Sequence, residues 1–203
     1  MNGRLITFEG IEGVGKSTQI QRAAEHLSGR AVIRLTREPG GTPLAEQIRS
    51  LVLSPTTETI SPSAELLLMM SARAIHTTNL IEPALERGEW VLCDRYSDAT
   101  RAYQGAGRGM DVSFINQLAV VCAIEPDLTI LLDAPVELAL QRVAARRGPT
   151  DRFEQERVEF FERVRAGYLA QAQRQPQRFR VVDASGSEER VAKTIADLLD
   201  AWP

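Results

Sequence analysis

The chain reads Phe8-Glu9-Gly10-Ile11-Glu12-Gly13-Val14-Gly15-Lys16-Ser17-Thr18 close to its N-terminus. An apolar run at residues 5–8 predicts a buried strand before the glycines, and helical periodicity at residues 19–27 predicts a helix after them. Glycines between a strand and a helix let backbone N–H groups converge on a phosphate chain, and the helix dipole favours its negative charge. The lysine and the hydroxyl that end the stretch suit the outer phosphates and Mg²⁺. The stretch therefore predicts a P-loop rather than a plain glycine-rich turn.

The bulk composition excludes several classes of protein. With 203 residues, of which 43% are hydrophobic and 25% charged, the chain can bury a full core, and we expect a single domain over residues 1–203. A net charge of −3 gives no basic field for a nucleic-acid polymer. Cys93 and Cys122 lack the spacing of a zinc site or a disulfide framework, and no apolar run reaches the length of a membrane span. We expect free thiols, no signal peptide and a cytoplasmic protein.

Apolar runs and helical patterns alternate along the rest of the chain. Further strands are predicted at residues 31–36, 90–93, 127–133 and 179–183. Helices are predicted at residues 44–53, 61–87, 112–124, 135–147, 154–175 and 188–201, and a glycine-rich loop at 100–109. This alternation predicts an α/β fold, a doubly wound five-stranded parallel sheet flanked by helices on both faces. The loops that follow the strands should gather at one edge, where a phosphate donor and an acceptor could meet.

Several side chains outside the glycine-rich stretch also suggest roles. Arg37 and Glu38 follow a predicted strand, on the side where α/β proteins bind ligands, although a solvated turn gives the same pattern. Glu65 lies within reach of the N-terminal cap of the predicted long helix. Met69 and the methionine after it are expected to pack in the core. No set of partners surrounds His76 in the sequence, so we expect it on the surface.

One concentrated basic patch occurs in the chain. It comprises Arg142, Arg146, Arg147 and Arg152. Arginines around a Gly-Pro pair suit a flap, or LID, at about residues 142–153 that grasps phosphate. A solvated helix end is the competing interpretation of the same residues.

Four segments follow one another along the chain: residues 10–18, Arg37-Glu38-Pro39-Gly40-Gly41-Thr42, Asp94-Arg95-Tyr96 and Tyr103-Gln104-Gly105. In this order they resemble the bacterial thymidylate kinases over essentially the whole chain, and the second and third segments are more diagnostic than the P-loop. The resemblance implies a P-loop NTPase fold of the nucleoside monophosphate kinase type. It also implies transfer of the γ-phosphoryl group of ATP to dTMP, giving dTDP and ADP in dTTP synthesis. Mg²⁺ would be the cofactor and a homodimer the usual assembly.

The resemblance assigns the phosphoryl donor to the glycine-rich stretch. It implies ATP contacts from Gly10, Ile11, Glu12, Gly13, Val14, Gly15, Lys16, Ser17 and Thr18, with Arg142 and Ala184 beside them. Ser17 and Asp94 would hold the metal, and Asp94 would also orient Arg95. Residues 11–14 contain no cation, so the arginine that stabilises the transition state would come from the flap, Arg147 first and Arg146 second. The implied catalytic residues are Lys16, Arg95, Arg147, Arg146 and Glu12.

The resemblance likewise implies an acceptor site. Its residues are Glu38, Arg49, Met69, Arg73, Asp94, Arg95, Thr100, Tyr103 and Gln104. Arg95 and Arg49 resemble the clamp on the acceptor phosphate, and Arg73 resembles the donor to thymine O4. Tyr103 would crowd the 2′ position of the sugar, while Thr100 and Gln104 would contact the rest of the base edge. The family often has a stacking phenylalanine where this chain has Met69, whose thioether can also pack on an aromatic face.

Two other functions remain open at this point. A P-loop kinase for a different small acceptor, such as another nucleotide or a deoxynucleoside, would use the same loop, but Arg95 and Arg49 favour an acceptor that already carries phosphate. A GTPase-like switch would use it too, but the chain contains no Asn-Lys-x-Asp sequence for reading guanine. We therefore expect ATP and dTMP as small-molecule partners, and neither a nucleic-acid polymer nor a membrane.

Overall fold

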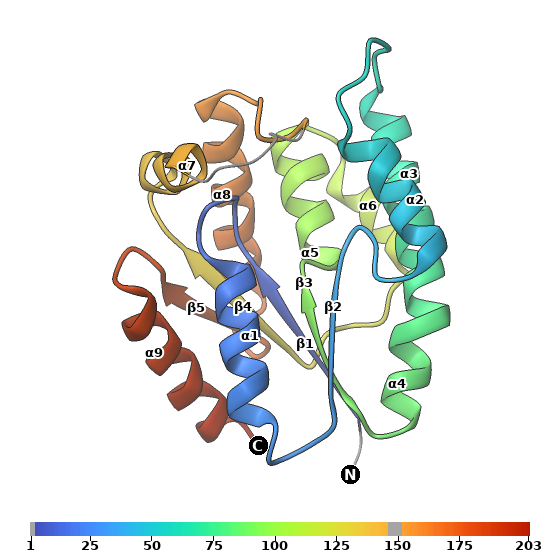
Figure 1. Ribbon diagram of the computed structural model, residues 1–203. Helices are drawn as coiled ribbons and strands as arrows, with labels where there is room; N and C mark the ends of the chain where they lie inside the picture. Colours follow the sequence, from blue (N-terminus) through green and yellow to red (C-terminus); the bar gives the residue numbers. More distant parts are fainter. Residues whose placement is uncertain (1–2, 146–151) are drawn as a thin grey trace.

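A five-stranded sheet lies at the centre of the computed structural model, which describes residues 3–145 and 152–203 (Figure 1). The strands are β1 (Arg4–Glu9), β2 (Ile33–Arg37), β3 (Trp90–Asp94), β4 (Leu128–Asp133) and β5 (Phe179–Asp183). They are hydrogen-bonded in the order β2-β3-β1-β4-β5, and every pair is parallel. The predicted α/β fold with five parallel strands is therefore confirmed. Because all strands run the same way, their carboxyl ends meet at one edge, the upper one in Figure 1.

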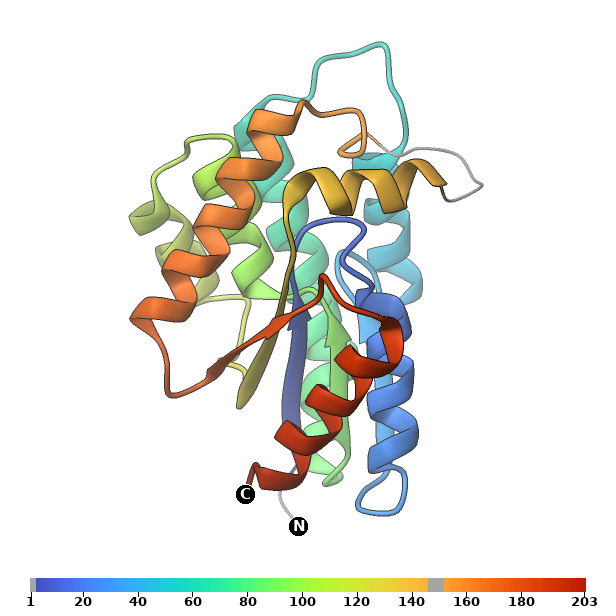
Figure 2. The ribbon, with the colours of Figure 1, turned by 90° about the vertical axis from the view of Figure 1, so that its left-hand side faces the viewer.

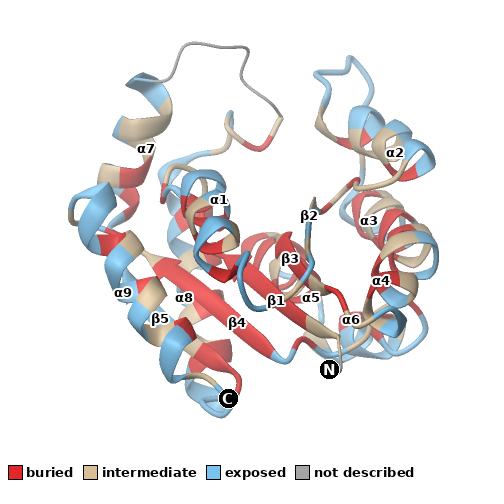
Figure 3. Ribbon diagram, turned by 60° about the horizontal axis from the view of Figure 1, so that its bottom comes forward, coloured by how far each residue is buried: buried red, intermediate tan, exposed pale blue. Residues whose placement is uncertain are grey.

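Helices cover both faces of the sheet. Figure 2 shows α1 (Lys16–Leu27) and α9 (Glu188–Ala201) side by side on one face and α8 (Val158–Arg174) on the other. One large cluster of buried apolar side chains joins the strands to these helices and includes Phe8, Ile130 and Phe161. Figure 3 shows the central strands buried between the helical layers. Strands covered on both faces need near-continuous apolar sequence, which is the pattern that predicted them.

The predicted helix at residues 61–87 is helical throughout but changes its winding. It consists of α3 (Pro62–His76), a π-helical segment η1 (Thr77–Ile81) and α4 (Glu82–Glu86). Ser61 caps its start, because its hydroxyl accepts a hydrogen bond from the N–H of Ala64. Pro83 lies just after the π-helical segment and has no N–H for the ordinary ladder, which is the local reason for the wider turn.

The prediction of a glycine-rich loop at residues 100–109 is wrong. Helix α5 (Ser97–Thr100) continues into the π-helical segment η2 (Arg101–Gly107), which packs against α8. A Cβ atom on Gly107 would lie 2.7 Å from the Phe160 ring and 2.9 Å from Val164. This glycine therefore permits close helix packing and does not mark a loop.

The remaining helices follow the predictions with shifted ends. They are α2 (Pro43–Leu53), α6 (Val112–Ala119), which stops five residues before the predicted end at 124, and α7 (Val136–Ala145). After α6 the chain turns, and Val120 is 80% exposed. Helix α8 begins at Val158 rather than at 154, because the chain first turns to bury Phe153. Within the two described ranges, no helix has the length and apolar composition needed to cross a bilayer.

Candidate active site

The glycine-rich stretch forms the turn between β1 and α1. Gly10, Gly13 and Gly15 have φ angles of +133°, +78° and +91°, which favour glycine. A Cβ atom on Gly13 would lie 2.0 Å from the carbonyl oxygen of Ala139, so this turn also packs tightly against α7. The sequence requires glycine here for both reasons, and the turn leads directly into the N-terminus of α1, where the helix dipole favours an anion.

Lys16 is the first residue of α1 and is buried. Its Nζ donates hydrogen bonds to the carbonyl oxygens of Gly10 at 3.2 Å and Ile11 at 2.8 Å. Burial lowers the pKa of Lys16, and the nearby Arg95 guanidinium adds to this effect. The ammonium group is thus held inside its own loop by carbonyl oxygens, which phosphate oxygens of a bound nucleotide can replace.

Ser17 and Asp94 come together at the mouth of this loop. The Ser17 hydroxyl donates to Asp94 Oδ2 at 3.2 Å, although the residues are 77 positions apart. Among the described residues, no group of three or more His, Cys, Asp or Glu side chains could hold a metal by itself. A hydroxyl beside one carboxylate nevertheless fits Mg²⁺, which takes few protein oxygens and completes its shell with phosphate and water.

Arg95 directly follows Asp94 and has a positive φ of 67°, which is unusual for a residue with a side chain. Its guanidinium donates to the Gly10 carbonyl at 2.9 Å, to the Tyr168 hydroxyl at 3.2 Å and to Glu12 Oε1 at 2.6 Å. The resemblance implied that Asp94 orients this arginine. The structure instead gives that role to Glu12 and Tyr168, while Asp94 bonds to Ser17.

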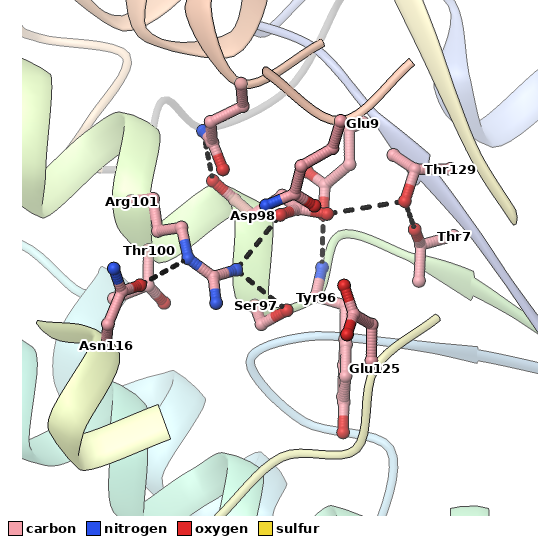
Figure 4. Close-up of polar contacts among 12 residues, drawn as sticks. Thr7, Glu9, Tyr96, Ser97, Asp98, Thr100, Arg101, Asn116, Glu125 and Thr129 are labelled. Carbon is pink, nitrogen blue, oxygen red and sulfur yellow. Dashed lines mark hydrogen bonds and ion pairs between the residues drawn. The ribbon is translucent and has the colours of Figure 1, made fainter. Parts of the chain in front are cut away.

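A buried polar network surrounds Glu9, which directly precedes the P-loop, and Asp98 in α5, and Figure 4 shows part of it. Glu9 accepts hydrogen bonds from the Tyr96 N–H at 2.7 Å and the Tyr168 hydroxyl at 2.8 Å. Burial raises the pKa of Glu9 to about 8, and the Asp98 carboxylate adds to the rise. Asp98 in turn pairs with Arg178 at 2.7 Å. Sequence reasoning missed this network, although a carboxylate at the end of an apolar strand signals a buried partner.

A second buried cluster surrounds Arg73 on α3. Arg73 Nε donates to Glu38 Oε2 at 2.7 Å, and both side chains are less than 5% exposed. Arg73 Nη2 donates to the carbonyl oxygen of Tyr96 at 3.1 Å and to Thr100 Oγ1 at 2.9 Å. His76 lies 3.1 Å from Glu38 Oε1 and is fully buried. The expectation of a surface histidine is therefore wrong, because its partners come from distant parts of the chain.

Two contiguous clefts open at the carboxyl edge of the sheet. The smaller is lined by Glu12, Glu38, Pro39, Arg49, Leu53, Met69, Arg73, Arg95, Tyr96, Ala99, Thr100, Tyr103, Gln104 and Phe153. The larger is lined by Glu12, Gly13, Gly15, Lys16, Ser17, Thr18, Arg37, Glu38, Arg49, Asp94, Arg95, Arg142, Val143 and Glu154. Four charged residues, Glu12, Glu38, Arg49 and Arg95, line both. Most of the predicted donor residues line the larger cleft and most of the predicted acceptor residues line the smaller, and the clefts meet at these four. Asp94, predicted for both the metal and the acceptor, lines the larger cleft alone, and the predicted ATP residues Gly10, Ile11, Val14 and Ala184 line neither.

Tyr103 forms the aromatic wall of the smaller cleft. Its ring packs edge-on against Phe153 with ring centres 5.7 Å apart, and the Arg95 guanidinium lies 4.8 Å from its centre. The buried Tyr103 hydroxyl makes no hydrogen bond of good geometry to the residues that the structure describes. Burial raises the pKa of Tyr103, and the nearby Arg95 guanidinium opposes this rise. Sequence reasoning missed Phe153, an aromatic side chain that lines the same cleft as Met69.

Glu65 and Arg152 have structural roles that the sequence did not predict. Glu65 is buried and accepts hydrogen bonds from Gln104 at 2.8 Å and Arg152 at 2.5 Å, so it does not cap its helix. Arg152 also donates to the carbonyl oxygen of Val52 at 2.9 Å. The expectation that Arg152 belongs to a phosphate-grasping patch is therefore wrong in this structure.

The end of α7 touches the loop after β5. Arg142 donates to the carbonyl oxygens of Ala184 at 2.8 Å and Ser185 at 3.2 Å. The predicted ATP residues Arg142 and Ala184 are thus in contact, and Arg142 lines the larger cleft, whereas Ala184 is buried behind it. Arg146 and Arg147, assigned to the flap by the resemblance, lie outside the described residues.

Two clefts that share charged side chains allow one bound molecule to pass a phosphoryl group to another while both are screened from water. A P-loop lines the larger cleft and arginines line the smaller. On a doubly wound parallel sheet, this arrangement defines a P-loop kinase that acts on a small, anionic acceptor.

Comparison with known proteins narrows this class. The family model described as thymidylate kinase matches residues 8–195. The thymidylate kinase of Alcanivorax borkumensis is 50% identical over the full length of both chains, and that of Chromohalobacter salexigens is 53% identical over 96% of this chain and 93% of its own. The crystal structure of thymidylate kinase from Ehrlichia chaffeensis superposes with a TM-score of 0.79 at 34% identity, covering 98% of this chain and 99% of that one. The chain belongs to the thymidylate kinase family, whose members are ATP-dependent nucleoside monophosphate kinases.

Proposed function

We propose that this protein binds ATP in the larger cleft and dTMP in the smaller, and transfers the γ-phosphoryl group from one to the other to give ADP and dTDP. The observation that carries the proposal is the set of charged residues that line both clefts. Arg95 is central because its guanidinium is held between the P-loop carbonyl of Gly10 and the Glu12 carboxylate. A planar fork at this junction suits the phosphate of the acceptor and the charge that develops during transfer.

On the donor side, residues 10–18 hold the phosphates of ATP. Lys16 supplies a positive charge to the outer phosphates, and Ser17 and Asp94 hold Mg²⁺ directly or through its water. When bound, the metal neutralises phosphate charge and orients the γ-phosphoryl group. Arg142, which contacts Ala184, forms the rim on the nucleoside side. The assignment of Arg147, with Arg146 as alternative, to the transition-state charge rests on the sequence alone.

On the acceptor side, Arg95 and Arg49 bind the phosphate of dTMP. Arg73 binds the base. Its Nε and Nη2 donate to protein oxygens, whereas Nη1, within the described part of the chain, donates only to the sulfur of Met70 at 3.6 Å, a weak acceptor. Nη1 is therefore the nitrogen that suits thymine O4. Thr100 and Gln104 line the same end of the cleft.

Tyr103 and Met69 complete the acceptor cleft. The Tyr103 ring occupies the space beside the sugar, where a ribose 2′-hydroxyl would have to fit. Its hydroxyl, which makes no hydrogen bond of good geometry to the described residues, suits a polar group of the substrate. Met69 packs against the base, and Phe153, close to Tyr103, supplies aromatic surface to the same cleft.

The protein is proposed to work as a homodimer in the cytoplasm. Leu66 of α3 and Ile115 of α6 belong to one buried apolar cluster. Their chain neighbours Leu67 and Phe114 are 55% and 47% exposed. With the exposed Val120, these side chains make an apolar surface of the kind that a second copy covers. Both cysteines are buried free thiols, in keeping with a reducing compartment.

A coupled assay of ADP release tests the proposed reaction. ATP and Mg²⁺ are held constant, and the acceptors are dTMP, dUMP, dCMP, dGMP, dAMP and thymidine. We expect the highest kcat/KM for dTMP and no turnover of thymidine, because thymidine lacks the phosphate that Arg95 and Arg49 bind. A higher kcat/KM for another monophosphate would assign the protein to a different acceptor, and turnover of thymidine would contradict the proposed phosphate clamp.

A further inference from the structure

His76 is a fully buried, titratable side chain that does not line either cleft. It is the last residue of α3, three positions after Arg73, so the two side chains lie on the same face of the helix. Its Nδ1 lies 3.1 Å from Glu38 Oε1 and its Nε2 lies 2.7 Å from Thr36 Oγ1. Each ring nitrogen thus has its own partner, and the imidazole cannot rotate without losing both.

Glu38 connects His76 to Arg73. One carboxylate oxygen accepts from Arg73 Nε at 2.7 Å, and the other lies against His76 Nδ1. Because an ionised carboxylate only accepts hydrogen bonds, Nδ1 is the nitrogen that carries the proton. A glutamate carboxylate with one hydrogen-bond partner can rotate about its Cγ–Cδ bond, whereas partners on both oxygens fix its orientation.

The loop that carries Glu38 also packs on the histidine. A Cβ atom on Gly41 would lie 2.4 Å from His76 Nε2 and 2.6 Å from Thr36 Oγ1. The loop backbone therefore rests directly on the imidazole and on its threonine partner. His76 joins β2, the loop after β2 and α3 at one point.

The direction of the Arg73 guanidinium follows from this arrangement. The group is planar, so the Nε bond to Glu38 sets where Nη1 points. Among the residues that the structure describes, Nη1 has only the weak sulfur acceptor of Met70. If the Glu38 carboxylate could rotate, the Arg73 guanidinium would rotate with it, and the Nη1 N–H groups would no longer point into the cleft.

We propose that His76 is a positioning residue that sets base selectivity, because it fixes Glu38 and thereby holds the Arg73 guanidinium toward the base of the acceptor. The proposal rests on the proposed contact of Arg73 with thymine O4. Uracil has the same carbonyl at that position, whereas cytosine has an amino group, which meets the arginine donor to donor. Selectivity for dTMP over dCMP therefore depends on His76, and selectivity for dTMP over dUMP does not.

Two variants of similar size separate positioning from general packing. His76→Asn places an amide N–H near the Nδ1 position and keeps the bond to Glu38, whereas His76→Gln reaches the Nε2 position and keeps the bond to Thr36. Each loses one buried hydrogen bond. We expect His76→Gln to lower the ratio of kcat/KM for dTMP over dCMP by roughly tenfold, mainly through KM for dTMP. His76→Asn keeps most of the wild-type ratio.

Thr77→Val is the matched control. The Thr77 hydroxyl is buried one position further along and contacts the Tyr96 hydroxyl at 3.0 Å and the Cys122 carbonyl at 3.3 Å, but not Glu38. Its loss should leave the dTMP to dCMP ratio unchanged. A cooperative thermal unfolding transition in each variant establishes that the variant is folded before its kinetics are compared. If His76→Gln does not fold, Glu38→Gln, which cannot accept from both neighbours, must lower the ratio instead.

The outcomes are distinct. An equal loss in His76→Gln and His76→Asn, or a parallel loss with dTMP, dUMP and dCMP, overturns the proposal, because damage to packing alone does not discriminate among acceptors. Arg73→Lys tests the underlying contact separately. If Arg73→Lys leaves the dTMP to dCMP ratio unchanged, the contact with thymine O4 is wrong. If Arg73→Lys lowers that ratio and His76→Gln does not, only the role of His76 is wrong.

Discussion

The Ser17 hydroxyl and the Asp94 carboxylate are joined by a hydrogen bond of 3.2 Å, which links the first turn of α1 to the end of β3. The link exists because β1 and β3 are neighbours in the sheet, with Phe8 opposite Asp94. Strand pairing therefore delivers the carboxylate to the P-loop. Two hard oxygen ligands at this point suit a cation that bridges protein and phosphate.

Asp94→Asn tests the metal assignment. The amide keeps the shape of the side chain but removes its charge, so we expect kcat to fall by about tenfold or more and the Mg²⁺ concentration for half-maximal rate to rise. The measurement is turnover against Mg²⁺ concentration at saturating ATP and dTMP. Asp133→Asn is the control, because Asp133 ends β4, which lies on the other side of β1 from β3, and pairs with Arg165. An unchanged Mg²⁺ requirement in Asp94→Asn would remove Asp94 from the metal site.

Lys16→Ala should lower kcat by about a hundredfold or more, because a buried point charge beside the transferring group is lost. The control is Lys193→Ala, which removes the other lysine of the chain, in α9. Lys193→Ala should keep wild-type kcat. Circular dichroism and unfolding curves establish that both variants fold. A folded Lys16→Ala protein with wild-type turnover would contradict the assignment.

Asp98→Asn should destabilise the fold by about 3 to 5 kcal/mol, because it removes the buried carboxylate that pairs with Arg178 and leaves this buried guanidinium an ion pair with the exposed Glu125 alone among the described residues. Urea unfolding measures the free energy of unfolding and its dependence on denaturant. Glu188→Gln breaks the exposed pair with Arg22 and should cost less than about 1 kcal/mol. Equal losses in the two variants would mean that the network around Glu9 and Asp98 does not stabilise the fold as argued.

Gly107→Ala should destabilise the protein by about 1 to 3 kcal/mol, because the added methyl group would press into the Phe160 ring. Gly29→Ala adds the same methyl group where no atom lies within 4 Å, and should be close to neutral. Thermal unfolding under identical conditions compares the two. If Gly107→Ala is as stable as Gly29→Ala, the close packing of η2 on α8 does not constrain this position.

Local sequence predicted the sheet and the P-loop because each depends on a short pattern. The six apolar-rich residues of β4 are enough to predict a buried strand, and the glycines at 10, 13 and 15 are enough to predict the turn. Burial at His76 depends on Glu38, which is 38 residues away, and no local pattern records that distance. The partners of His76 could be identified only once the fold was known.

The wrong predictions for Gly107 and Arg152 have the same physical cause. Gly107 marks close packing of two helices, yet in the sequence it is indistinguishable from a loop glycine. Arg152 neutralises the buried Glu65, yet in the sequence it belongs to a run of cations near the flap. In both cases the deciding partner lies on another element. The identity of one residue does not predict which side chain from another element will contact it.

The charged junction between the clefts, formed by Glu12, Glu38, Arg49 and Arg95, has a thermodynamic consequence. A ligand in either cleft changes the charge and contacts that the other ligand meets, so the two binding free energies are not independent. Linkage requires that the factor by which ATP changes the dissociation constant of dTMP equals the factor by which dTMP changes that of ATP. The two substrates are therefore mutual effectors, coupled through shared side chains without any separate regulatory site.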